Sequence, residues 1–137
     1  MIRLTTDPID FSALVEVVRR RDCGAVVLFL GTVRERTGDQ LTTALDYEAY
    51  TSMAEVKLAE VEAETRARWP VGEIALVHRL GHLVVGEISV AVAVACPHRV
   101  EAFAAGQYAI DRLKQVVPIW KRENRPTGEQ QWVHPHA

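Results

Sequence analysis

The most informative segment of the chain is Ile88-Ser89-Val90-Ala91-Val92-Ala93-Val94-Ala95, which continues directly into Cys96-Pro97-His98-Arg99. Its first part is rich in small and β-branched apolar residues and predicts a strand over residues 87–96. The proline then opens a long helix that ends near Val117, because Pro118 breaks it. We therefore expect a strand that passes straight into the longest helix of the chain.

Further strands surround this unit. Residues 73–80 predict a strand that is joined to the first by a turn from Gly81 to Gly86. The continuous apolar run over residues 25–33 predicts a strand buried on both faces. Shorter strands are expected over residues 2–6 and 41–50, a hairpin over 119–124 and 130–134, and a polar loop over 34–40.

Two more helices are indicated upstream. Asp10 is a suitable N-cap for a short helix that ends before Gly24. Ser52 and Glu55 have the spacing of a capping box, which predicts a second helix that runs to about Trp69. The expected apolar side of that helix consists of Val56, Ala59, Ala63 and Ala67.

Because helices and strands alternate only partly, the pattern favours an α+β fold over a doubly wound parallel sheet. The chain has 137 residues, no internal repeat and no linker-like segment, which predicts a single domain over residues 1–137.

Composition narrows the function. With 48% hydrophobic residues and a net charge of −2, the chain has the profile of an ordinary globular protein and lacks the basic excess of a general nucleic-acid binder. It has no apolar run long enough for a membrane span and no signal-peptide pattern, so we expect a cytoplasmic protein. Cys23 and Cys96 form neither a zinc spacing nor a disulfide framework.

Lys114 is the first candidate functional residue. On a helical wheel it falls on the apolar side, where its neighbours are Phe103, Gln107, Ile110 and Val117. Spacing alone leaves two interpretations open. The lysine either extends its ammonium group out to solvent, or it lies in a pocket with an anionic partner or a lowered pKa.

His98 and Arg99 form a second candidate, at the start of the long helix. Free N–H groups at a helix N-terminus attract anions, and cationic side chains beside them strengthen that attraction. This arrangement favours a phosphate-binding site, although two solvated side chains would fit the pattern equally well.

The segment after the long helix alternates apolar and polar residues. Lys121 and Glu123 would share one face of a strand, with Trp120 and Arg122 on the other. The alternative is an edge strand with a solvated charged face.

Arg34 follows Gly31-Thr32-Val33, where an apolar strand exits into a polar loop, and it could contact an anion there.

Two other arrangements are weaker. Cys96 and His98 invite a cysteine–histidine dyad, but a thiol at the end of an apolar strand is more typical of an inert core residue. His78 and His82 have i,i+4 spacing, which makes a zinc site only on a helix, and here they fall on a strand and a turn. We expect no metal site.

Taken together, these residues resemble the large, catalytic subunit of molybdopterin synthase, the MoaE family. The resemblance covers roughly residues 24–133 and is carried, in order, by Gly24-Ala25-Val26-Val27, Gly31-Thr32-Val33-Arg34, Arg68-Trp69-Pro70-Val71-Gly72, His78-Arg79-Leu80-Gly81, Pro97-His98-Arg99, Phe103-Ala104-Ala105-Gly106-Gln107, Leu113-Lys114 and Pro118-Ile119-Trp120-Lys121-Arg122-Glu123.

The resemblance implies an α/β-hammerhead fold and sulfur transfer. A small ubiquitin-like subunit of the MoaD type would carry a thiocarboxylate on its C-terminal glycine, and the substrate would be cyclic pyranopterin monophosphate, which becomes the molybdopterin dithiolene. It also implies a homodimer flanked by two small subunits, as a heterotetramer. Since the sulfur arrives on the partner, no cofactor is expected and neither cysteine needs to react.

The resemblance also assigns residues. Lys114 and Lys121 match the two active-site lysines of the family. The positions that match substrate-binding residues are Thr32, Val33, Arg34, His98, Arg99, Lys114, Lys121, Arg122 and Glu123.

Three other functions remain as alternatives. A non-catalytic module that binds a phosphorylated metabolite would use the same basic cluster. A scaffold that docks another protein would need neither Lys114 nor Lys121, and a cysteine hydrolase would need Cys96.

Overall fold

The computed structural model describes residues 1–133. In chain order its elements are β1 (Ile2–Thr5), α1 (Phe11–Val18), β2 (Ala25–Thr32), β3 (Arg36–Thr37), β4 (Gln40–Leu41), β5 (Ala44–Ala49), α2 (Thr51–Arg68), β6 (Glu73–Arg79), β7 (Gly81–Val84), β8 (Ile88–Cys96), α3 (Arg99–Val116), β9 (Ile119–Asn124) and β10 (Gln130–Val133).

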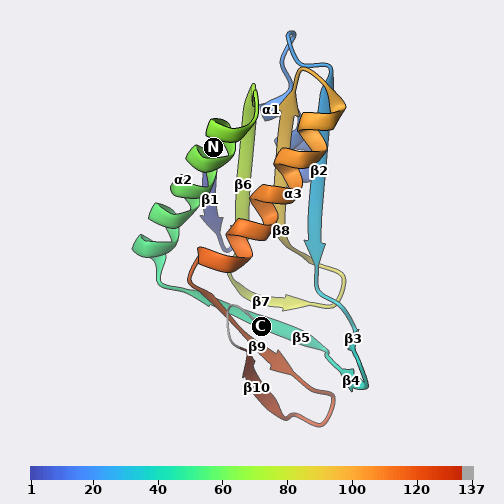
Figure 1. Cartoon of the computed structure of the whole chain (residues 1–137). Helices are drawn as coiled ribbons and strands as arrows, with labels where there is room; N and C mark the ends of the chain where they lie inside the picture. The colour runs from blue at the N-terminus through green and yellow to red at the C-terminus, as the bar shows by residue number, and fades with distance from the viewer. Residues whose placement is uncertain (134–137) are drawn as a thin grey trace.

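The first sheet has the strand order β1-β6-β8-β2. The β1–β6 pair is parallel, whereas β6–β8 and β8–β2 are antiparallel. Helices α2 and α3 lie on one face of this sheet and α1 lies on the other (Figure 1). This mixed arrangement confirms the expected α+β class.

The second sheet has the order β10-β9-β5-β7 and is antiparallel throughout. It lies below the first sheet in Figure 1, next to the C-terminal end of α3. Because β9 begins just after α3 ends, the long helix connects the two sheets directly.

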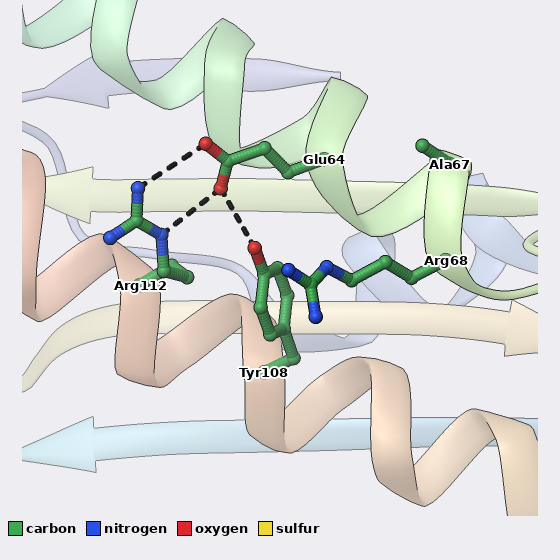
Figure 2. Close-up of a pocket in the computed structure, with 5 residues that line it drawn as sticks. All are labelled: Glu64, Ala67, Arg68, Tyr108 and Arg112. Atoms are coloured by element: carbon green, nitrogen blue, oxygen red, sulfur yellow. Dashed lines mark hydrogen bonds and ion pairs between the residues drawn. The ribbon is translucent and has the colours of Figure 1, made fainter.

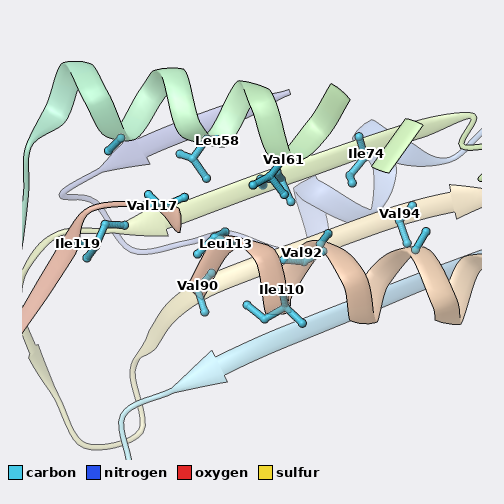
Figure 3. Close-up of a cluster of buried hydrophobic side chains, with 14 of the residues drawn as sticks. Leu58, Val61, Ile74, Val90, Val92, Val94, Ile110, Leu113, Val117 and Ile119 are labelled. Atoms are coloured by element: carbon cyan, nitrogen blue, oxygen red, sulfur yellow. The ribbon is translucent and has the colours of Figure 1, made fainter. Parts of the chain in front are cut away.

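Strand β8 is buried on both faces, and its side chains alternate in size. Val90, Val92 and Val94 pack into the core under α2 and α3 (Figure 3). Ala91 and Ala93 face the other way, toward Leu14 and Val18 of α1. The strand predicted over residues 87–96 is thus confirmed, and its period of two assigns valines to one helix layer and alanines to the other.

The prediction for residues 25–33 was wrong in one respect. These residues do form a strand, but β2 lies at the edge of the sheet and is not buried on both faces. Val26 and Phe29 are 39% and 37% exposed. A continuous apolar run does not distinguish a central strand from an edge strand whose apolar side chains form an interaction surface, because both have the same composition.

The apolar side predicted for α2 was also wrong. Val56, Ala59, Ala63 and Ala67 are all exposed. The buried residues are instead Ala54, Leu58, Val61 and Thr65. Thr65 is polar, so the sequence does not mark it as part of the buried face. In the structure it can be buried because its hydroxyl donates a hydrogen bond to the Val61 carbonyl at 2.7 Å.

The predicted capping box at Ser52 is not formed either. Helix α2 begins two residues earlier, with Tyr50 as an N-cap that makes no side-chain hydrogen bond. The Tyr50 carbonyl already accepts a hydrogen bond from the Ala54 amide at 2.8 Å, so Ser52 lies inside the first turn.

Two short features were missed. The polar loop contains the hairpin formed by β3 and β4, with Gly38 between them at φ +60°. The segment predicted as a turn from Gly81 to Gly86 contains β7, which pairs with β5 and so belongs to the second sheet.

Other expectations are confirmed. The Asp10 side chain caps α1 by accepting from the Ala13 amide at 3.1 Å, and α2 ends at Arg68, before Trp69 and Pro70. The β9–β10 hairpin forms as expected up to Val133, and residue 134 lies outside the described residues. None of the helices within residues 1–133 is long and apolar enough to cross a lipid bilayer.

The alanines of β8 yield a stability prediction. Ala93 is fully buried against α1, so Ala93→Leu should overpack this layer and lower the free energy of unfolding in urea by about 1–3 kcal/mol. The same substitution at the exposed Ala63 should change it by less than about 0.5 kcal/mol. Equal effects at the two positions would contradict the close approach of α1 to β8.

Candidate active site

A cavity of about 350 Å³ opens where the two sheets meet the C-terminal end of α3. It receives residues from β2, β5, β8, α3 and β9 and from the segment between β2 and β5. The residues that line it are Phe29, Gly31, Thr32, Arg34, Thr37, Thr42, Leu45, Tyr47, Ser89, Lys114, Lys121 and Glu123.

Three cationic side chains converge on this cavity: Arg34, Lys114 and Lys121. Loss of water around the ammonium group of Lys114 lowers the pKa of this lysine, and the positive charges of Lys121 and Arg34 lower it further. Lys114 is exposed by surface area, yet it lines the cavity beside two other cations, so the structure favours the pocket interpretation with a pocket that is open to solvent.

Among residues 1–133, Glu123 is the one acidic residue that lines the cavity, and its charge is already balanced. Its carboxylate forms a 2.8 Å ion pair with Arg125, and the two side chains are only 11% and 9% exposed. The cavity consequently keeps a positive surplus from Arg34, Lys114 and Lys121, which favours an anionic ligand.

The strand alternation predicted for residues 119–124 is confirmed. Lys121 and Glu123 face the cavity, whereas Arg122 lies on the opposite face of β9. There the Arg122 guanidinium donates to the Asp46 carboxylate at 3.0 Å and lies over the ring of Trp132.

Asp46 links three strands on that outer face. Burial would raise the pKa of this carboxyl, but hydrogen bonds from Asn124, His82 and Arg122 outweigh burial and bring the pKa below its usual value. The cluster connects β5, β7 and β9 and so supports the sheet on whose other side the cavity lies.

At the end of β2, residues 32–34 point alternately into the cavity and into the core. Thr32 and Arg34 line the cavity. Val33 is 3% exposed and packs with Leu45 and Leu83, so its side chain anchors the segment and does not reach the cavity.

His98 and Arg99 lie elsewhere. His98 is the N-cap of α3 and both side chains are exposed, at the opposite end of the helix from Lys114. With a rise of about 1.5 Å per residue, Arg99 and Lys114 are about 22 Å apart along the helix axis. Within one chain the structure does not bring the two groups together.

Tyr47 and Ser89 also line the cavity, and neither is a site residue predicted from the sequence. Burial raises the pKa of the Tyr47 hydroxyl, which lies beside the Ser89 hydroxyl. Ser89 was detectable in principle, because it is a single hydroxyl in an otherwise apolar strand. Nothing local distinguishes Tyr47, whose position depends on the pairing of β5 with β9.

The two histidines considered for a metal have separate partners. The Nδ1 of His78 lies 2.8 Å from the Arg79 carbonyl oxygen, and the Nδ1 of His82 lies 2.7 Å from the Asp46 carboxylate. Their i,i+4 spacing therefore does not create a shared site.

Cys96 is fully buried in the core under α3, and burial raises the pKa of its thiol. A buried thiol with a raised pKa is a poor nucleophile, which argues against the cysteine–histidine dyad.

A second, open hollow of about 410 Å³ lies between α2 and α3. Figure 2 shows that its polar residues satisfy one another: Glu64 accepts hydrogen bonds from Arg112 and Tyr108, and Arg68 lies over the Tyr108 ring. These contacts connect the two helices, and we interpret the hollow as structural.

The fold and the site define a class of protein: an α+β domain with a cationic cavity suited to a small anionic molecule. The family model described as MoaE protein matches residues 4–116. The chain therefore belongs to the MoaE family, which makes it a sulfurtransferase enzyme of molybdenum cofactor biosynthesis.

Individual relatives agree with this assignment. The molybdopterin synthase catalytic subunit of Bacillus subtilis is 45% identical over 130 residues, which cover 95% of this chain and 82% of the relative. The crystal structure of molybdopterin synthase from Staphylococcus aureus matches with a TM-score of 0.90 at 41% identity, over 95% of this chain and 94% of that one. A complex of subunits 1 and 2 of molybdopterin-converting factor from Helicobacter pylori shares the fold, with a TM-score of 0.76 at 18% identity over 97% of this chain and 88% of that one.

His78 beside the cavity yields a pH prediction. Burial lowers the pKa of this imidazole from 6.5 to about 4. The unfolded chain therefore binds more protons between these values, so the stabilisation is present above pH 6.5 and is lost as the pH falls toward 4. Across this range the wild type should lose about 3 kcal/mol more unfolding free energy than His78→Gln, as measured by urea denaturation. Parallel pH profiles for the two proteins would contradict a buried neutral imidazole.

Proposed function

We propose that this chain transfers sulfur from the C-terminal thiocarboxylate of a small ubiquitin-like carrier of the MoaD type to cyclic pyranopterin monophosphate. The observation that carries the proposal is the surplus of three cations, Arg34, Lys114 and Lys121, in a cavity where Glu123, the one carboxylate contributed by the described part of the chain, is paired with Arg125. Both reactants bring negative charge to the same place, a phosphate on one and a thiocarboxylate on the other.

The cavity suits such a substrate in shape and chemistry. Its volume of about 350 Å³ lies in the range of small-molecule sites. Phe29 and Tyr47 supply aromatic surface for a flat ring, while Thr32, Ser89 and Glu123 supply polar groups for its edges.

Lys114 and Lys121 are assigned the chemistry. Lys114 would stabilise the negative charge on the thiocarboxylate and on the tetrahedral intermediate that forms from it. Its lowered pKa also brings it closer to the range in which an amine can exchange protons at neutral pH. Lys121 would orient the substrate or transfer a proton, and Arg34 would hold the phosphate by charge-assisted hydrogen bonds.

The carrier subunit is supported by a relative. The structure from Helicobacter pylori is a complex of two subunits of molybdopterin-converting factor. In this chain, Lys114 is exposed along part of its length at the edge of the cavity, so a flexible C-terminal tail could reach its ammonium group from outside.

A homodimer would explain His98 and Arg99. Both are exposed at the far end of α3, yet the resemblance assigns them to substrate binding. Pairing the edge strand β2 with its symmetry mate would run the two copies in opposite directions and bring Arg99 of one α3 toward the cavity of the other. Val100 and Phe103, which are 73% and 66% exposed on α3, would supply apolar contact area beside that edge.

A reconstitution tests the chemistry. The chain is mixed with thiocarboxylated carrier and cyclic pyranopterin monophosphate, and molybdopterin is quantified. Lys114→Ala should lower the rate by roughly a hundredfold or more, because it removes a charge that stabilises the intermediate. Lys57→Ala, on α2 and paired only with Glu60, is the matched control and should leave the rate unchanged. No product from the folded wild type with a cognate carrier would instead favour a non-catalytic module that binds a phosphorylated metabolite.

Subunit complementation tests the shared site. Lys114→Ala and Arg99→Ala homodimers, each impaired, are mixed and allowed to exchange subunits. If each cavity takes Lys114 from one copy and Arg99 from the other, a mixed dimer contains one intact site, and the mixture should recover about a quarter of wild-type activity. If both residues act within one chain, every site in the mixture lacks one of them and no activity returns.

A further inference from the structure

Arg125 lies just beyond the cavity lining, where the chain turns from β9 into β10. Its amide donates to the Glu129 carbonyl at 2.8 Å, and its carbonyl accepts from the Gly128 amide at 3.0 Å. The turn therefore fixes both backbone polar groups of Arg125. Because Arg125 comes two residues after Glu123, the strand period of two directs both side chains toward the same side of the sheet.

The guanidinium group of Arg125 joins three segments. Its Nη2 pairs with Oε2 of Glu123 at 2.8 Å and also donates to the side-chain oxygen of Gln131, on β10, at 3.2 Å. Its Nη1 donates to the Leu41 carbonyl, at the end of β4, in a longer hydrogen bond of 3.5 Å. Figure 1 shows the β3–β4 and β9–β10 hairpins at the same end of the molecule, and Arg125 connects them there.

Glu123 has other cations within reach. Lys121 precedes it by two residues on the same face of β9, and Lys114 and Arg34 line the same cavity. Two residues of an extended strand span about 7 Å, a distance that a glutamate and a lysine side chain can bridge. Among residues 1–133, however, the ion pair of Glu123 is with Arg125, and none joins it to the three cations of the cavity. The carboxylate is thus held by a cation that does not line the cavity.

This ion pair is shielded from water. The side chains of Arg125 and Glu123 are only 9% and 11% exposed, so solvent and salt screen their attraction less than that of a surface pair. Without Arg125, the carboxylate would be left in this sheltered position with no counter-charge, which is strongly unfavourable. The cations that line the cavity would then be its available partners, and an ammonium group paired with a carboxylate is withdrawn from an incoming anion.

We propose that Arg125 is a positioning residue: it binds the Glu123 carboxylate and so keeps Lys114 and Lys121 free to meet the anionic groups of substrate and carrier. The inference rests on the proposed function, because that function assigns the sulfur transfer to these two lysines. Arg125 does not touch the reacting atoms, and its effect is exerted through Glu123.

A small set of variants separates this role from a purely structural one. Arg125→Met removes the guanidinium, so Glu123 loses its partner, and the double variant Glu123→Gln/Arg125→Met removes the whole pair. Arg125→Gln is also uncharged but can still donate a hydrogen bond, and it takes the place of Arg125→Met if that variant does not fold. Arg19→Met, which breaks an exposed ion pair with Glu16 on α1, is the matched control.

The first readout needs no substrate, because the ion pair is present in the free chain. The chain has three lysines, and acetylation of Lys114 and Lys121 by acetic anhydride at about pH 8 is followed by peptide mass spectrometry with Lys57 as internal reference. A released carboxylate stabilises a protonated ammonium group, so Arg125→Met should slow acetylation of one or both cavity lysines roughly three- to tenfold. The double variant releases no carboxylate and should react at the wild-type rate.

Two outcomes of this experiment would overturn the proposal. Wild-type acetylation rates in folded Arg125→Met, or in Arg125→Gln if it is used, would show that Glu123 does not depend on Arg125. Equally slow acetylation in the double variant would show that loss of the guanidinium acts by displacing the hairpins. The other titratable groups near the lysines keep their state at this pH, because Arg34 stays charged and burial keeps Tyr47 and His78 neutral.

The second readout is molybdopterin formation in the reconstituted reaction. Arg125→Met should lower kcat/KM for cyclic pyranopterin monophosphate roughly tenfold, mainly through KM, because the cavity loses part of its positive surplus. Arg125→Lys keeps a cation beside Glu123 and should recover most of this loss, and Arg19→Met should match the wild type. A wild-type kcat/KM in folded Arg125→Met would overturn the proposal. If the wild type forms no product, the proposed function fails, whereas the acetylation rates still decide whether Arg125 keeps the lysines free.

Discussion

Helix α3 packs closely against β8 and β2 because the residues that it turns toward the sheet are small. A Cβ added at Gly106 would already be in van der Waals contact, 3.4 Å from a methyl group of Val27, so the helix backbone passes close to β2. This contact determines the direction of α3 and brings its C-terminal end to the junction of the two sheets (Figure 1). Lys114 lies in the last turn of the helix, and Lys121 follows on the strand into which the chain then passes. One helix–sheet contact thus places both lysines at the same cavity.

The cavity gathers like charges, and this arrangement has an electrostatic cost. Arg34 and Lys121 both lower the pKa of Lys114, which shows that the three groups oppose one another in the free chain. The carboxylate that could relieve them is paired with Arg125, which lies outside the lining. An anionic ligand relieves this repulsion on binding, so the same arrangement that disfavours the free site favours the complex. The neutral His78 is buried against Tyr47, which lines the cavity. Burial lowers the pKa of this imidazole, so the folded chain loses stability in acid.

Strand β2 shows how composition can mislead about burial. Its apolar run predicts a central strand, yet β2 is an edge with Val26 and Phe29 partly exposed. The error has a physical cause, because side chains covered by helices of the same chain and side chains covered by another protein obey the same hydrophobic pattern. Val26 and Phe29 point to opposite faces of this edge strand, and Val100 and Phe103 of α3 are more exposed still. We place the proposed second copy along this edge.

Four features could be predicted from the amino-acid sequence: the strand that runs into α3, the α+β class, the placement of Lys121 and Glu123 on one face of β9 with Arg122 on the other, and the family resemblance. These features depend on residues close in sequence, whose period of 2 or 3.6 is visible in the chain itself. Contacts between distant segments place Tyr47 and Ser89 in the same cavity as Lys114, pack His78 against Tyr47, and keep His98 at the other end of α3. These positions depend on the pairing of β5, β6 and β8 and on the length of α3, which bring together or separate residues by contacts between distant segments. The buried face of α2 was likewise not predictable from the sequence, because it includes Thr65, whose hydroxyl can be buried only when it donates a hydrogen bond to the Val61 carbonyl.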